Sequence, residues 1–110
     1  MRVYVAGPYT LGSTAANVRA AIDAGQKLFI AGHTPYIPHL SHLWSLVYPM
    51  PYAHWMQLGL DWLHQCEAVL RLPGESAGAD VEVSVARSIG IPVFFNVLDL
   101  APEADDDYDL

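Results

Sequence analysis

Short β-branched runs alternate along the chain with segments in which apolar residues recur at helical spacing. Residues 2–7 (RVYVAG) form such a run and end at a Gly-Pro pair, which predicts a first strand. A helix is predicted next, capped by Ser13 or Thr14 and stopped at Gly32. Its expected apolar stripe consists of Val18, Ile22, Gly25, Leu28 and Phe29. Residues 33–38 (HTPYIP) predict a second strand, which its two prolines place at a sheet edge.

The middle of the chain is less regular. Residues 39–51 are apolar and interrupted by prolines, so we expect a loop with one helical turn. A helix is predicted over 52–65, a strand over 67–72, a Gly-rich turn over 73–79, a helix over 78–90 and a strand over 91–97. The inward residues expected for the first of these helices are Trp55, Leu58, Gly59, Trp62 and Leu63.

This alternation of strands and helices predicts the α/β class, a parallel sheet with helices on both faces. Right-handed crossovers and a second strand at the edge favour the strand order 2-1-3-4, which is a small flavodoxin-like, three-layer domain. The chain has 110 residues, enough for one domain. We assign residues 1–98 to that domain and residues 99–110 to an acidic, flexible tail.

Charge and composition limit the classes of binding partner that we expect. The net charge is −7, but the segment APEADDDYDL at the end of the chain carries five of the acids. No basic footprint remains, so polymeric nucleic acid is not an expected partner. The chain is 53% hydrophobic with three Trp and six Tyr, which predicts a homodimer or higher homo-oligomer. A single cysteine, Cys66, and no apolar run of membrane-spanning length predict a cytoplasmic protein without a membrane partner.

Glu82 is the most unusual residue of the pattern. On a helical wheel it lies only about 20° from Ile89, inside the apolar arc of Val81, Val85, Ala86 and Ile89. A carboxylate at the start of a helix, held ionised by the helix dipole and partly shielded from water, can serve as a nucleophile. The alternative is an acid that turns outward and only complements the dipole.

Two turns meet at the expected switch point of the sheet, where ligands bind in such folds. They are AGPYT after the first strand and PGESAGAD after the third, each followed by a helix. Backbone amides over Ser76–Ala79 suit an anion such as a phosphate, although an ordinary strand-to-helix turn explains the same residues.

Other polar side chains carry weaker signals. Asp61 shares a polar helix face with His54, Gln57, His64 and Gln65, which favours a solvated side chain over a general acid. The histidines, among them His39 and His42 at spacing three, lack the cysteine or carboxylate ligands of a metal motif. We therefore expect no metal and no cofactor.

Three segments together resemble the nucleoside 2-deoxyribosyltransferase superfamily, which includes the 2′-deoxynucleoside 5′-monophosphate N-glycosidases. They are Tyr4-Val5-Ala6-Gly7, Asp61-Trp62-Leu63 and the segment from Ser76 to Glu82 (SAGADVE), and the similarity covers residues 1–96. The resemblance implies cleavage of the N-glycosidic bond of a 2′-deoxynucleoside or its 5′-monophosphate, with transfer of the sugar to another base or to water.

The resemblance also implies a role for particular residues. It matches Glu82 to the nucleophile, Asp61 to the acid that assists departure of the base, and Tyr4 to a residue that positions sugar and nucleophile. It places substrate contacts at Gly7, Pro8, Tyr9, Ser76, Gly78 and Ala79. Members that require a 5′-phosphate carry Ser and Arg where this chain has Pro8-Tyr9-Thr10, so nucleoside and nucleotide both stay open. Cleavage of NAD and a silent nucleotide-binding module are the alternative functions.

Overall fold

A four-stranded parallel sheet forms the centre of the protein. The computed structural model describes residues 1–100 and 102. Strand β1 (Arg2–Ala6) pairs with β2 (Thr34–Tyr36) on one side and with β3 (Ala68–Arg71) on the other, and β3 pairs with β4 (Val93–Phe94). The order β2-β1-β3-β4 confirms the predicted topology. In β2, Pro35 lies opposite Val3 at the edge, where its missing N–H costs no ladder bond.

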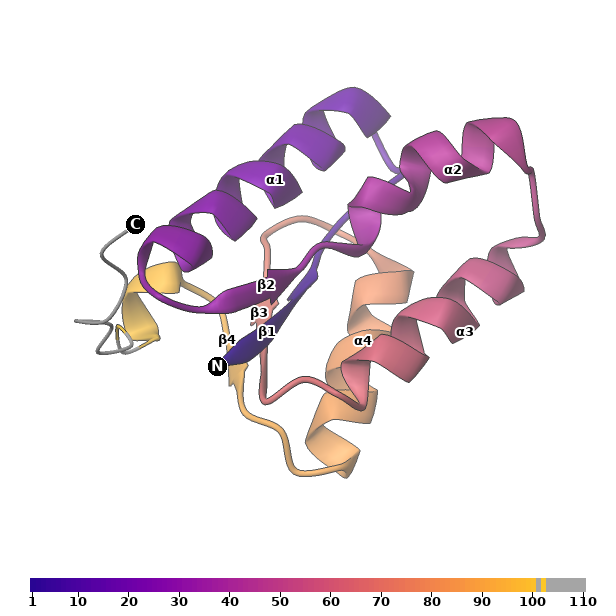
Figure 1. The fold of residues 1–110 in the computed structure, drawn as a ribbon. Coiled ribbons are helices and arrows are strands. Elements are labelled where there is room, and N and C mark those ends of the chain that lie inside the picture. Colours follow the sequence, from indigo (N-terminus) through magenta and orange to yellow (C-terminus); the bar gives the residue numbers. More distant parts are fainter. Residues whose placement is uncertain (101, 103–110) are drawn as a thin grey trace.

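Helices cover both faces of this sheet, as predicted (Figure 1). Helix α1 (Thr14–Ile30) packs on one face, and α3 (Tyr52–Leu63) and α4 (Ala77–Ser88) pack on the other. Between β2 and α3 the chain forms the 3₁₀ turn η1 (Pro38–Leu40) and helix α2 (Ser41–Val47), and η2 (Val97–Asp99) follows β4.

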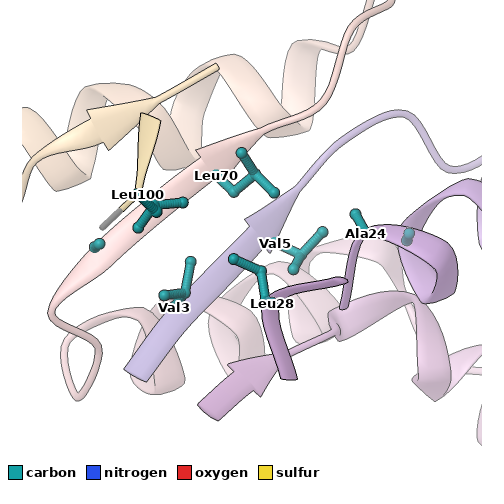
Figure 2. Packing of buried hydrophobic residues seen from close by; sticks show 8 residues of the cluster. Val3, Val5, Ala24, Leu28, Leu70 and Leu100 are labelled. Atoms are coloured by element: carbon teal, nitrogen blue, oxygen red, sulfur yellow. The ribbon is translucent and has the colours of Figure 1, made fainter. Parts of the chain in front are cut away.

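Alternation along the strands divides the core into two layers. Val3, Val5 and Leu70 face α1 and pack with Leu28 and Leu100 (Figure 2). Tyr4, Ala6 and Val69, the neighbours of these residues along the strands, point the other way. They form the second layer with Leu63 of α3 and with Ala79 and Ala86 of α4. A strand buried on both faces is what a sheet with helices on both sides requires. Tyr4 therefore lies under α3 and α4, on the side of the sheet that carries Glu82.

The helix faces differ in part from the prediction. The buried residues of α1 are Ala21, Ala24, Gly25 and Leu28, whereas Ile22 and Phe29 are exposed. Small residues face the sheet because they allow the helix to approach it closely: a Cβ at Gly25 would collide with the Ile37 side chain. In α3, Trp62 is half-exposed rather than inward, and its ring stacks on Tyr36.

Three element boundaries also need correction. Residues 39–51 contain more than one helical turn, since α2 runs for seven residues. None of the residues of α2 is buried, so the helix has no buried apolar face whose spacing would have predicted it. Strands β2 and β4 are shorter than predicted, and β4 ends early because Asn96 Oδ1 accepts the Leu98 N–H and starts η2.

The core extends past residue 98. Leu100, which we assigned to the tail, is 3% exposed and packs against the α1 side of the sheet. Apart from Asp99, Leu100 and Pro102, the predicted acidic tail lies outside the described residues. No helix in the described part of the chain is long and apolar enough to cross a membrane.

Candidate active site

Glu82 lies on the buried side of α4. The helix starts where Ser76 caps it, with Ser76 Oγ accepting the Ala79 N–H at 3.0 Å. From this start, the positions that face the sheet are Ala79, Glu82, Val83 and Ala86. Only 8% of Glu82 is exposed, so the predicted inward orientation is confirmed and the solvated alternative is wrong. The arc itself is rotated from the predicted one, since Val81 and Ile89 are exposed.

A fully buried tyrosine holds the Glu82 carboxylate. Tyr4 of β1 donates its hydroxyl hydrogen to Glu82 Oε2. Burial raises the pKa of Glu82 to about 7, although the Tyr4 hydrogen bond and the Arg71 charge both act to lower it. Burial and the neighbouring Glu82 raise the pKa of Tyr4, so the phenol stays protonated and remains a donor. Such a carboxyl titrates in the neutral pH range, as many catalytic groups do.

Gly59 of α3 makes room for this pair. A Cβ built at Gly59 would lie 2.6 Å from the Tyr4 hydroxyl oxygen and 3.6 Å from Glu82 Oε2. A side chain at this position would therefore push against the hydrogen bond itself.

Arg71 orders the loop between β3 and α4. The residue is buried at the end of β3, and its guanidinium donates to the Leu72 carbonyl, to the Gly74 carbonyl at 3.0 Å and to Asp80 Oδ1 at 3.0 Å. One side chain thus ties the strand end, the turn and the first turn of α4 together. This fixes the start of the helix that carries Glu82.

Tyr4 and Glu82 border one cavity of about 300 Å³, a volume that suits a small ligand. Strand β1 and the residue after it contribute Tyr4 and Gly7, and α4 with its N-cap contributes Ser76, Gly78, Ala79 and Glu82. Helix α3 and the turn before it contribute Met50, Tyr52, Trp55 and Met56, and the opposite wall consists of Tyr9, Pro38, His39, Ser41 and Ser45. The cavity lies beyond the carboxyl ends of β1 and β3, the predicted switch point.

A close approach of α3 and α4 closes one side of this cavity. A Cβ at Gly78 would collide with the Tyr52 hydroxyl and lie 3.1 Å from Met56 Cε. With a Cβ at position 78, the ends of the Tyr52 and Met56 side chains would have to move away from the start of α4.

His39, Tyr9 and His42 form a polar cluster along the opposite wall. His39 is buried and its Nε2 is 2.9 Å from the Pro8 carbonyl oxygen. Burial lowers the pKa of His39, which keeps the imidazole neutral. The Tyr9 hydroxyl is hydrogen-bonded to His42 Nδ1, and the Tyr9 ring packs edge-to-face on both imidazoles.

Seven of the nine predicted site residues line the cavity, and two do not. Asp61 is on the exposed face of α3, where its Oδ1 accepts a hydrogen bond from Gln57 Nε2 at 2.8 Å. Its acid role, implied by the resemblance, stays a prediction. Pro8 is not in the lining, but its carbonyl oxygen contacts His39.

Sequence reasoning missed the wall formed by η1, α2 and α3. Ser41 and Ser45 are four residues apart, so they share one helix face, and they lie among apolar residues that point elsewhere. The four-residue spacing of Ser41 and Ser45 indicates a polar helix face only if the segment is a helix, and the sequence predicts mostly a loop over residues 39–51. Over the described residues, no group of three or more His, Cys, Asp or Glu side chains is placed to hold a metal ion.

Three comparisons with known proteins bear on the fold and the family of this chain. No curated protein matches the chain. Among solved structures, a 2-deoxyribosyltransferase from the psychrotolerant bacterium Bacillus psychrosaccharolyticus is similar, with a TM-score of 0.65 and 17% identity over 84% of this chain and 69% of that one. At this identity the likeness shows the flavodoxin-like fold. A family profile described as "Domain of unknown function (DUF4406)" matches residues 1–95, and the chain belongs to that family.

Proposed function

We propose that this protein cleaves the N-glycosidic bond of 2′-deoxynucleosides or their 5′-monophosphates and passes the deoxyribosyl group to another base or to water. The observation that carries the proposal is the buried Glu82 carboxylate, which borders the cavity and is held by Tyr4. The fold shared with a 2-deoxyribosyltransferase supports it.

Glu82 is the nucleophile in this proposal. Tyr4 occupies Oε2, which leaves Oε1 to attack the anomeric carbon of the sugar. A C1′–O bond to Glu82 forms as the C1′–N bond breaks, and the bonding electrons leave with the base. A second base or water then attacks C1′ and returns Glu82 to its carboxylate form, as in retaining glycosidases. Tyr4 positions the carboxylate and stabilises its negative charge.

The cavity walls suit the two halves of a nucleoside. The Trp55 ring and the Met50 and Met56 side chains offer an apolar surface for a base. The Ser76 hydroxyl and the start of α4 offer polar groups that suit the 5′ end of the sugar. All five Lys and Arg residues of the chain are described, and none lines the cavity, so a 5′-phosphate would rely on helix amides.

The test is a panel of deoxynucleosides and deoxynucleotides, with and without an acceptor base, analysed by chromatography. We expect release of free base by the wild type and transfer when an acceptor is present. Glu82→Gln should abolish release, and Glu75→Gln, an exposed carboxylate in the preceding loop, is the matched control. Mass spectrometry of the wild type mixed with substrate should detect a deoxyribosyl adduct on the peptide that contains Glu82.

Three outcomes contradict the proposal. Undiminished turnover by Glu82→Gln would show that Glu82 is not the nucleophile. Consumption of NAD without turnover of any deoxynucleoside would favour a glycohydrolase of NAD. Thermal stabilisation by a nucleotide with no product after long incubation would favour a silent binding module.

A further inference from the structure

A proton assists the departure of a neutral nucleobase, and Glu82 cannot supply that proton while it acts as the nucleophile. The base leaves with the electron pair of the glycosidic bond, and protonation of a ring nitrogen or oxygen makes it a far better leaving group. In this chain the Asp61 carboxyl is outside the cavity and bonded to Gln57. The proton donor for the departing base should therefore be a residue that borders the cavity.

Three of the side chains that line the cavity can be compared as proton donors to the base. Tyr4 already donates to Glu82. His39 is held by the Pro8 carbonyl, and burial keeps its imidazole neutral. Tyr9 differs from both, because it borders the cavity and its hydroxyl is bonded to a second titratable side chain, His42. His42 is only half-buried, so it can exchange protons with solvent.

Tyr9 is also held firmly in place. The Asn17 side chain donates to the Tyr9 carbonyl and to the Leu11 carbonyl, each at 2.9 Å, and so fixes the loop on both sides. The Tyr9 ring packs edge-to-face on His39 and His42, with ring centroids 6.0 Å and 5.5 Å apart respectively. A phenol held at backbone, ring and hydroxyl has the fixed position that proton transfer needs.

We propose that Tyr9 and His42 form a proton relay that protonates the departing base, an inference that rests on the function proposed above. Protonated His42 donates its Nδ1 hydrogen to the Tyr9 oxygen, and Tyr9 passes its own hydroxyl hydrogen to the base. The C1′–N bond breaks, the base departs neutral, Glu82 becomes esterified to C1′, and His42 is left as a neutral imidazole. When water attacks C1′, its proton returns through Tyr9 to His42.

The experiment compares substrates that need the proton with substrates that need it less. 7-Methyl-2′-deoxyguanosine already carries a positive charge on its base and departs without protonation, whereas 2′-deoxyguanosine needs a donor. If the enzyme turns over pyrimidines only, 5-fluoro-2′-deoxyuridine and 2′-deoxyuridine form the equivalent pair. Each pair is used as the nucleoside or the 5′-monophosphate, whichever the wild type turns over.

Tyr9→Phe should lower turnover of 2′-deoxyguanosine by about 10²- to 10⁴-fold and turnover of the 7-methyl substrate by less than about tenfold. In the pyrimidine arm, the loss should be smaller for the fluorinated substrate. His42→Gln should show the same selectivity. Tyr48→Phe, which removes an exposed hydroxyl at the end of α2, is the matched control and should change neither rate.

The outcomes separate this inference from the proposed function. Equal losses on both substrates of a pair would mean that Tyr9 only shapes the cavity, and the relay would be overturned while the glycosidic reaction stands. A selective loss in Asp61→Asn but not in Tyr9→Phe would assign the proton to Asp61. Release of base from no substrate by the wild type would remove the reaction and the relay together.

Discussion

Glu82→Gln should make the protein more stable at high pH while it destroys the proposed nucleophile. Burial raises the pKa of Glu82 from 4.5 to about 7, so the folded state resists ionisation that the unfolded chain accepts readily. The favourable contribution of the protonated carboxyl is fully present below pH 4.5 and is lost as the pH rises through about 7. Gln keeps the shape and an oxygen for Tyr4 without a charge.

The magnitude follows from the separation of the two pKa values. At about 1.4 kcal/mol for each pKa unit, the full cost of ionising Glu82 in the folded state is about 3 kcal/mol. Between pH 5 and pH 8, the free energy of unfolding of Glu82→Gln minus that of the wild type should rise by about 2–3 kcal/mol. Titrations of all other groups cancel in this difference.

Urea unfolding at pH 5 and pH 8, at one fixed protein concentration, measures this difference. Glu75→Gln, which removes an exposed carboxylate of the loop before α4, should leave the difference unchanged with pH. A pH-independent difference for Glu82→Gln would refute the reasoning, because it would mean that the carboxyl is ionised in the folded state without cost.

Three further predictions concern the groups around Glu82. Gly59→Ala places a methyl group 2.6 Å from the Tyr4 hydroxyl oxygen, so it should lower turnover of the folded protein at least tenfold. The control Gly25→Ala crowds the opposite face of the sheet. It should reduce stability in denaturant titrations and leave the turnover of folded molecules unchanged. Arg71→Met removes a positive charge that lowers the pKa of Glu82, so the rising limb of the pH–rate profile should move to higher pH. The other groups that face this carboxyl, Tyr4, Tyr36 and Tyr52, are unchanged in the variant. A rising limb that does not move would contradict the electrostatic role of Arg71. Ser76→Ala and Ser13→Ala each remove a helix cap and should each cost about 1 kcal/mol in thermal or urea unfolding, but only Ser76→Ala should also reduce turnover, and equal activities would place Ser76 outside the site.

Local sequence patterns determined most of the fold. The short β-branched runs of the strands, the Gly and Pro stops and the helix caps at Ser13 and Ser76 are set by each segment's own residues, which is why the topology was predicted correctly. The inward position of Glu82 also followed from the helical repeat alone, since seven residues bring it back near Ile89. The exact arc did not, because small residues outside the predicted apolar stripes face the sheet: Ala79 in α4, and Ala21 and Ala24 in α1.

What only the tertiary structure decided was which side chains meet around the carboxylate. Tyr4 and Glu82 are 78 residues apart, and Tyr9 and His42 are 33 apart, and no local periodicity relates positions so distant. The wall from η1 and α2 was hidden for a related reason: none of the residues of α2 is buried, so burial imposed no readable pattern on it. The neutral-range pKa of Glu82 has the same origin, since desolvation depends on what the folded chain packs around the carboxyl and is absent in the sequence of α4 alone.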